Sequence, residues 1–150
     1  MIAVFVTGMR EGRLGQSREN LIYKVSNVCI NELNLSKFEA VVHVKQARSR
    51  KLLEDYALGF ASMDMVDTDQ GPIKWGVIEL ANQNKAQLVK SLCHEWTHIK
   101  QYLRKELNYN ADKWHKSKIT EDYANNPAEV EAFEMQEKLF QKCVDLKIVY

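Results

Sequence analysis

Residues 85–107 constrain the fold more than any other segment of this chain, because they predict one helix with two distinct faces. The apolar side chains fall within an arc of about 100° on a helical wheel; they are Leu88, Val89, Leu92, Trp96, Ile99, Leu103 and Leu107. His94 and His98 lie outside this arc and follow each other by one helical turn. We therefore expect the helix to pack its apolar face on a core and to present its histidines elsewhere.

The histidines belong to the sequence HEWTH, an HExxH motif with Glu95 between them. Two imidazoles at this spacing can reach one tetrahedral zinc ion, and the intervening glutamate can act as the base for a water that the metal activates. The same letters also occur by chance on exposed helices, and they supply only two ligands. A metal centre therefore needs a third ligand from another segment.

Candidates for the third ligand lie downstream and are His115, Glu121, Asp122, Glu129, Glu131 and Glu134. On the helix predicted from Pro127 to about Lys147, Glu129 falls within the apolar arc, where a carboxylate is costly unless a cation pairs with it. Glu131 and Glu134 fall outside that arc. His115 stands among lysines, whose charge disfavours a dication. We predict Glu129 as the third ligand, with Glu131 and His115 as the remaining alternatives.

The other segments predict the layout of the fold. The predicted elements are a strand at 2–6, a helix at 17–34 with Ser17 as its N-cap, and strands at 38–47, 56–66 and 73–81. With the two later helices, this order predicts an α+β fold with a small mixed sheet, formed by one domain over residues 1–150. The polar stretch at 108–126 is long for a loop, and we expect it to rim a site.

Composition restricts the partners and the compartment. The chain has 21 basic and 20 acidic residues, so no global charge draws it to nucleic acid or to a membrane surface. The basic cluster Lys45, Arg48, Arg50 and Lys51 reads as a solvated turn. Three cysteines without CxxC spacing indicate no disulfide framework, and Cys93 points away from the side of His94. Without a signal peptide or an apolar run of membrane-spanning length, we expect a cytoplasmic protein, in bacteria or in the host of a phage.

Together, CHEWTHIKQY and NPAEVEAFEMQ resemble the gluzincin type of zinc metallopeptidase, most closely its small single-domain forms such as the minigluzincins. In that clan a small residue often follows the glutamate ligand by three positions, as Ala132 follows Glu129. Family members often carry an acidic residue or an asparagine four positions after the ligand, where this chain has Phe133. The partner that orients a histidine is therefore unassigned.

The resemblance implies a zincin-like fold with one Zn²⁺ held by His94, His98 and Glu129, and peptide-bond hydrolysis with Glu95 as the general base. It also implies an edge strand beside the active-site helix that binds a protein or peptide substrate, and the run 73–82 is the best match. A weaker resemblance to SprT-like proteases, which are associated with nucleic acid, would make His115 the ligand. A non-catalytic peptide- or protein-binding domain on the same scaffold is the other alternative.

Overall fold

A computed structural model describes residues 1–9, 13–46, 58–107, 113–114, 117–118 and 126–149 of the chain. The elements, in chain order, are β1 (Ile2–Thr7), α1 (Arg13–Glu32), β2 (Ala40–Gln46), β3 (Gly59–Thr68), β4 (Gly71–Leu80), α3 (Lys85–Leu103), β5 (Lys113–Trp114), β6 (Ser117–Lys118) and α4 (Pro127–Asp145). The order and the mixed sheet confirm the predicted α+β fold class.

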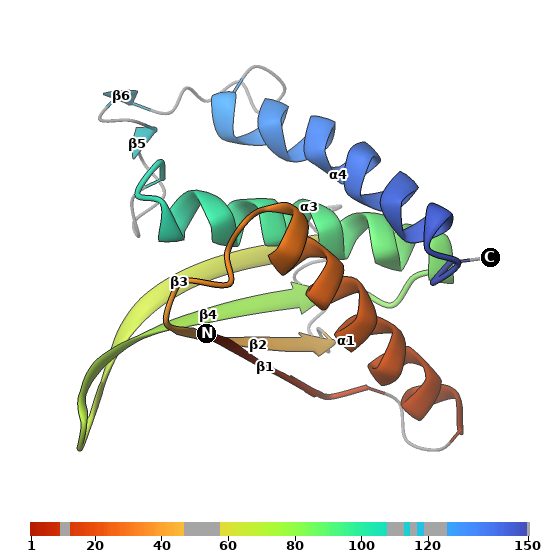
Figure 1. Ribbon diagram of the computed structural model, residues 1–150, viewed down its shortest axis with the longest axis horizontal. Coiled ribbons are helices and arrows are strands. Elements are labelled where there is room, and N and C mark those ends of the chain that lie inside the picture. Colours follow the sequence, from red (N-terminus) through yellow and green to blue (C-terminus); the bar gives the residue numbers. More distant parts are fainter. Residues whose placement is uncertain (10–12, 47–57, 108–112, 115–116, 119–125, 150) are drawn as a thin grey trace.

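The main sheet has the strand order β1-β2-β4-β3. Strands β1, β2 and β4 run parallel to one another, and β3 pairs antiparallel with β4. Alternate residues of β2 are buried, namely Ala40, Val42 and Val44, and this face of the sheet carries the helices. The helices therefore cover one face of the sheet, the face that carries these buried side chains (Figure 1).

The prediction that the run 73–82 is an edge strand is wrong. Ile78 of β4 lies opposite Val44 of β2 and opposite Ala61 of β3, so β4 has a partner on both sides. The cause is the hairpin that joins β3 to β4: it turns back at Gly71, whose φ of 103° suits glycine, and it places β3 on the outer side of β4. Among the described strands, the edge strand that contacts the HExxH helix is β3.

The helices form two further layers above the sheet (Figure 1). Helices α1 and α3 pack on the sheet, and α4 packs on α3. Trp96 of α3 is fully buried, and its Nε1 donates to the Oγ of Ser26 on α1 at 3.0 Å. At Gly76 a Cβ would lie 3.1 Å from Cδ1 of Ile99, so this glycine allows α3 to approach β4 closely. The HExxH helix therefore occupies the middle layer of the molecule.

The helix boundaries correct the sequence prediction at the start of α1 and at the end of α3, which ends at Leu103 and not at Leu107. Helix α1 begins at Arg13, so Ser17 lies within the helix and is not its N-cap. Gly15 does not prevent the earlier start, because a glycine lowers helix stability by only about 1 kcal/mol. Helix α4 begins with Pro127 in its first turn, as predicted. The predicted loop at 108–126 contains the two-residue strands β5 and β6, and most of its other residues lie outside the described part of the chain.

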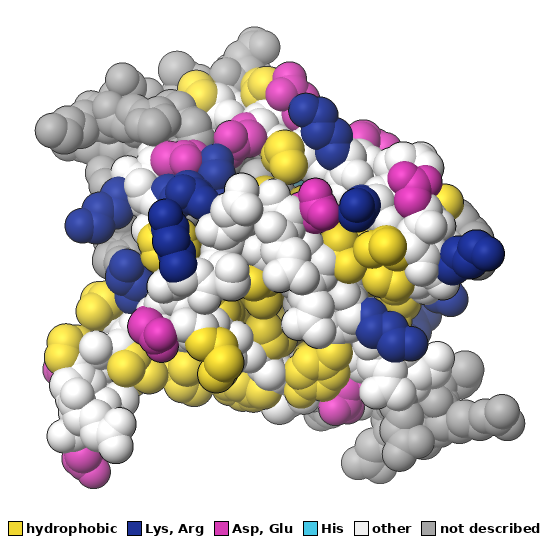
Figure 2. All heavy atoms as spheres, in the orientation of Figure 1, with side chains coloured by type: hydrophobic (Ala, Val, Ile, Leu, Met, Phe, Trp, Pro, Cys, Tyr) yellow, Lys and Arg dark blue, Asp and Glu magenta, His cyan; other side chains and the backbone are white. Residues whose placement is uncertain are grey.

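The described surface mixes charges of both signs, and its hydrophobic side chains gather along the lower margin, over the strands (Figure 2). Exposed large hydrophobic side chains include Met1, which precedes β1, and Phe60 and Met65 of β3. Lys45 of the predicted basic cluster pairs with Glu79 at 3.3 Å, whereas its other members lie outside the described residues. No described helix has the length and apolarity needed to cross a membrane.

Candidate metal centre

Helix α3 carries the HExxH motif and is buried on both of its predicted faces. Asn84 caps the helix, because its side chain accepts from the backbone N–H of Gln87 at 2.9 Å. The apolar stripe packs into the core as predicted, with Trp96 and Ile99 fully buried. The histidines lie on another side, yet they are also buried, since α4 covers them. This second layer of packing brings α4 to the imidazoles.

Glu129 in the first turn of α4 reaches both histidines. Its Oε2 lies 2.9 Å from Nε2 of His94, and its Oε1 lies 3.0 Å from Nε2 of His98. The three ligand atoms lie within 4.8 Å of one another. The side chains of His94, His98 and Glu129 are 8%, 10% and 13% exposed, so the group is largely buried but still reaches solvent. His94, His98 and Glu129 thus form a group that could bind a metal ion.

Two of the other candidate ligands, Glu131 and Glu134, belong to the described residues, and the remaining three do not. Glu131 is turned toward Lys100, with its carboxylate oxygens 2.9 Å and 3.0 Å from Nζ, and it does not belong to the metal-binding group. Glu134 is exposed. His115, Glu121 and Asp122 lie outside the described residues. Among the residues that the structure describes, Glu129 is therefore the candidate ligand that lies with the histidines.

The Nδ1 atoms of the histidines contact glutamine amides. Oε1 of Gln101 lies 2.8 Å from Nδ1 of His98, and Oε1 of Gln136 lies 3.0 Å from Nδ1 of His94. The sequence left these partners unassigned, because Phe133 occupies the position where the resemblance suggested one; its ring packs edge-on against His94 at 4.6 Å. Gln101 is three residues after His98 on the same helix, so helical spacing could have identified it.

Glu95 extends from α3 toward β3 and is buried. A Cβ at Gly59, the first residue of β3, would come within 3.1 Å of both Cγ and Oε1 of Glu95, so the glutamate packs directly on the glycine backbone. Burial raises the pKa of the Glu95 carboxyl, an effect that His98 and His94 oppose and Glu129 reinforces. The carboxylate thus stands beside the metal-binding group in a dry setting. Sequence reasoning did not identify Gly59.

The raised pKa of His98 indicates that the metal-binding group favours a positive charge. Burial by itself would lower the pKa of His98, but the hydrogen bond with Glu129, the charges of Glu95 and Glu129 and the contact with Gln101 raise it to about 9. In the absence of metal, the two carboxylates therefore hold a proton on this imidazole. A site that attracts a proton in this way also attracts a metal cation, which competes with the proton for Nε2.

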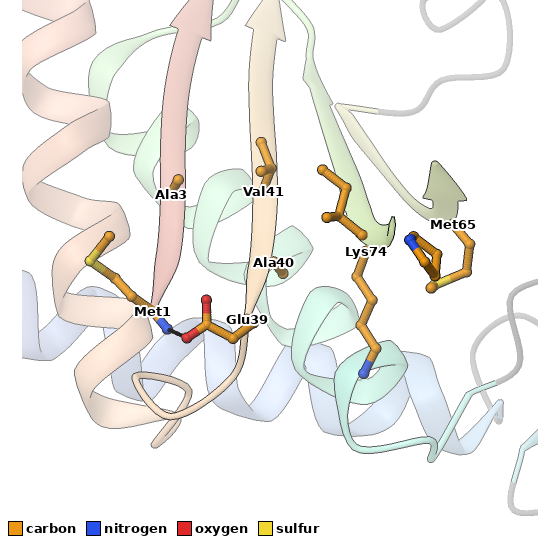
Figure 3. A pocket seen from close by; sticks show the side chains of 9 residues that line it. Met1, Ala3, Glu39, Ala40, Val41, Met65 and Lys74 are labelled. Carbon is orange, nitrogen blue, oxygen red and sulfur yellow. Dashed lines mark hydrogen bonds and ion pairs between the residues drawn. The ribbon is translucent and has the colours of Figure 1, made fainter. Parts of the chain in front are cut away.

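Two other features of the structure lack the groups that a metal centre needs. A pocket at the start of β1 and β2 is lined by Met1, Glu39, Lys74 and neighbouring residues (Figure 3), and the amino group of Met1 already pairs with Glu39 at 2.7 Å. Cys93 adjoins His94 in sequence, but its Sγ lies in the core 3.8 Å from Sγ of Cys29. Within the described part of the chain, His94, His98 and Glu129 are the one group of this kind.

Comparisons with known proteins give no family for the chain. A scan against models of protein families, a search of curated proteins and a search of solved structures each found no match. The functional conclusions therefore depend on the geometry of the metal centre itself.

Proposed function

We propose that the chain is a zinc-dependent metallopeptidase of the gluzincin type. The observation that carries the proposal is the convergence of two imidazole Nε2 atoms and the Glu129 carboxylate within 4.8 Å, with the buried Glu95 on the same helix. Two histidines and one carboxylate are one of the ligand sets found in catalytic zinc sites, which keep one coordination position open. Structural zinc sites are usually closed by four cysteine or histidine ligands, and they have no use for Glu95.

The residues of the site divide the chemistry among them. When bound, zinc supplies Lewis acidity, which lowers the pKa of water and polarises the carbonyl of a scissile peptide. Glu95 accepts the proton of the attacking water on its carboxylate and later passes it to the leaving amine. Gly59 leaves room for this side chain, because a Cβ at that position would lie 3.1 Å from Cγ and Oε1 of Glu95. The low exposure of the site strengthens each of these electrostatic interactions.

The substrate class follows from the edge strand β3. Within the described residues β3 pairs with β4 alone, and its first residue, Gly59, touches Glu95. An extended peptide that adds to β3 therefore runs past the general base. Backbone hydrogen bonds to such an edge are largely independent of the peptide's sequence. We accordingly propose a protein or peptide substrate on β3, in place of the strand at 73–82.

Metal removal tests the proposed function. We expect the purified chain to contain a single equivalent of zinc by inductively coupled plasma mass spectrometry and to cleave peptides from a proteome-derived peptide library. Dipicolinic acid should remove the zinc and abolish cleavage, since the Lewis acid is then absent, and added Zn²⁺ should restore both. Cleavage that persists in demonstrably zinc-free protein would overturn the proposal. A zinc-loaded chain that cleaves nothing in the library would point instead to a non-catalytic binding domain.

A small change at Gly59 should impair the same reaction without removing the metal. In Gly59→Ala the new methyl group meets Cγ and Oε1 of Glu95 at 3.1 Å and displaces the carboxylate. The carboxylate must move by a few tenths of an ångström. Because a displacement near 1 Å can cost about 10²-fold in rate, we expect this smaller one to lower kcat by roughly 3- to 10-fold. Zinc content, measured on the same samples, should be unchanged. An unaltered kcat would show that Glu95 does not need the space at Gly59.

A further inference from the structure

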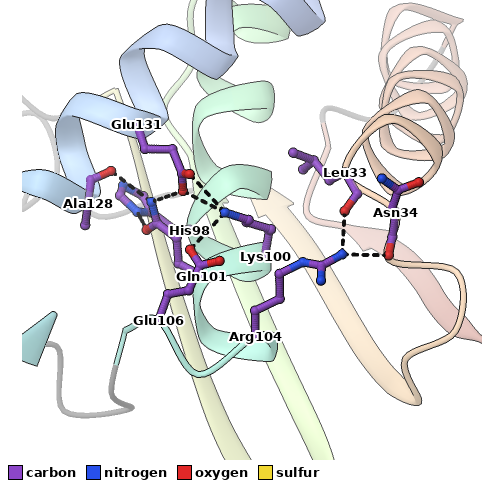
Figure 4. Close-up of polar contacts among 9 residues, drawn as sticks. All are labelled: Leu33, Asn34, His98, Lys100, Gln101, Arg104, Glu106, Ala128 and Glu131. Carbon is purple, nitrogen blue, oxygen red and sulfur yellow. Dashed lines mark hydrogen bonds and ion pairs between the residues drawn. The ribbon is translucent and has the colours of Figure 1, made fainter. Parts of the chain in front are cut away.

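A network of hydrogen bonds and ion pairs lies beside the imidazole of His98 (Figure 4). Its centre is Gln101, which is fully buried and has hydrogen-bond partners at both ends of its amide. Nε2 of Gln101 donates to the carbonyl oxygen of Ala128 and to Oε1 of Glu131, each at 3.0 Å. Both of these partners are acceptors only. The NH₂ end of the amide must therefore face α4, and Oε1 must face His98.

The orientation of Gln101 determines the protonation of His98. An amide oxygen can only accept, so Nδ1 of His98, at 2.8 Å, must carry the hydrogen of this bond. The opposite nitrogen, Nε2, is then the one available to a metal ion, and it points to Glu129. The hydrogen-bond network thus keeps a hydrogen on Nδ1 whether or not Nε2 is protonated. When zinc takes the place of the proton at Nε2, the imidazole is left in the tautomer that coordination requires.

His94 has a similar but less strongly held partner. Oε1 of Gln136 lies 3.0 Å from Nδ1 of His94, and Nε2 of Gln136 donates to Oε1 of Glu137 at 3.1 Å. This again directs the amide oxygen toward the imidazole and leaves Nε2 for the metal. Gln136 is only half-buried, and its bond to Glu137 is exposed. The two histidines should therefore differ in how strongly their tautomers are held.

Glu131, one of the alternative ligands, has a distinct place in the network. Its carboxylate lies 2.9 Å and 3.0 Å from Nζ of Lys100, which also binds Glu106 at 2.8 Å. This cation holds the Glu131 carboxylate in place beside the amide of Gln101. Because Gln101 also binds Ala128, the residue before Glu129, the same network docks the first turn of α4 against α3. Glu131 therefore acts on the metal centre through Gln101.

We propose that Gln101 and Gln136 are positioning residues that preset the tautomers of His98 and His94, and that Glu131 orients Gln101. For its functional consequence this inference rests on the proposed zinc site. The orientation of the hydrogen bonds, however, is a property of the metal-free chain as well. Outer partners of zinc-bound histidines typically change metal affinity by about 10- to 100-fold, so the effect is measurable.

Zinc affinity, measured by competition with a chromophoric chelator, tests the consequence. Gln101→Leu should lose about 10- to 100-fold in affinity, and Gln136→Leu less, because Gln136 is more exposed. Glu134→Gln is the matched control, since Glu134 is an exposed glutamate on the same helix, outside the network. Affinities within about twofold of the parent chain for both leucine variants would overturn the proposal.

Exchanging the amide of Gln101 with the carboxylate of Glu131 distinguishes a role of Gln101 in orienting His98 from a role in packing alone. Gln101→Glu alone places a second carboxylate against Glu131 and should weaken zinc binding. Combined with Glu131→Gln, it provides an acceptor for Nδ1 of His98 and a donor for that acceptor, so the double variant should regain affinity. A role in packing alone predicts no such recovery, and its absence would count against the tautomer mechanism.

Nuclear magnetic resonance tests the hydrogen bond itself, independently of zinc or hydrolysis. In the ¹⁵N-labelled metal-free chain at neutral pH, the Nδ1–H proton of His98 should exchange slowly with water. Gln101→Leu should abolish this slow exchange at His98 and leave that of His94 unchanged. If the parent chain shows this behaviour but binds no zinc, the proposed function fails and the network stands. Equal exchange rates in parent and variant overturn the network even where zinc binds.

Discussion

Glu95→Gln should bind zinc like the parent chain and lose hydrolysis by about 10²- to 10⁴-fold, the range for removal of a general base. The amide has nearly the same volume as the carboxylate and can keep the contact with Gly59, but it cannot accept a proton. Because Glu95 is not a member of the metal-binding group, the ligands remain intact. The measurement is zinc content and cleavage of the peptide library on the same preparation.

Glu134→Gln serves as the control for this variant, because it removes the same charge from an exposed position on α4. It should retain full activity. Cleavage at the parent rate by Glu95→Gln would remove Glu95 from the mechanism, even if the chain is a zinc enzyme. Loss of zinc from Glu95→Gln would instead show that Glu95 supports the metal rather than the proton transfer.

Glu129→Ala should lose zinc affinity by more than about 100-fold, beyond the usual effect of an outer partner. The substitution removes the carboxylate that lies 2.9 Å and 3.0 Å from the Nε2 atoms, and leaves two imidazoles to hold the ion. Hydrolysis should fall with zinc occupancy. Competition with a chromophoric chelator measures the affinity, and mass spectrometry of the purified protein measures the occupancy.

The remaining ligand candidates provide the comparison. Glu131→Ala should weaken zinc binding less than Glu129→Ala, because Glu131 acts through Gln101. His115→Ala should leave the affinity near that of the parent chain. If His115→Ala loses the metal and Glu129→Ala retains it, the ligand set is that of the SprT-like pattern, and the gluzincin assignment fails.

The local pattern of the sequence was sufficient to predict the two helices that carry the candidate metal ligands. Regular spacing of apolar residues predicted α3 and its buried stripe, and it separated His94 and His98 from that stripe. On α4 the position of Glu129 among apolar residues indicated that its carboxylate needs a cation, and the structure places it against both histidines. The helices and the relative positions of these side chains could be predicted because helical periodicity is a property of neighbouring residues.

The tertiary structure decided the features that depend on contacts between distant segments. In the described sheet, strand pairing makes β4 an interior strand and β3 an edge strand. The alternation of apolar and polar residues within either strand does not reveal which strand lies at the edge. The contact between Gly59 and Glu95, and the bonds from Gln101 to Ala128 and Glu131, join segments far apart in the chain. The sequence by itself determined the helices and the ligand types. Which groups surround the ligands was decided by packing, because hydrogen bonds and steric contacts form only once the layers are assembled.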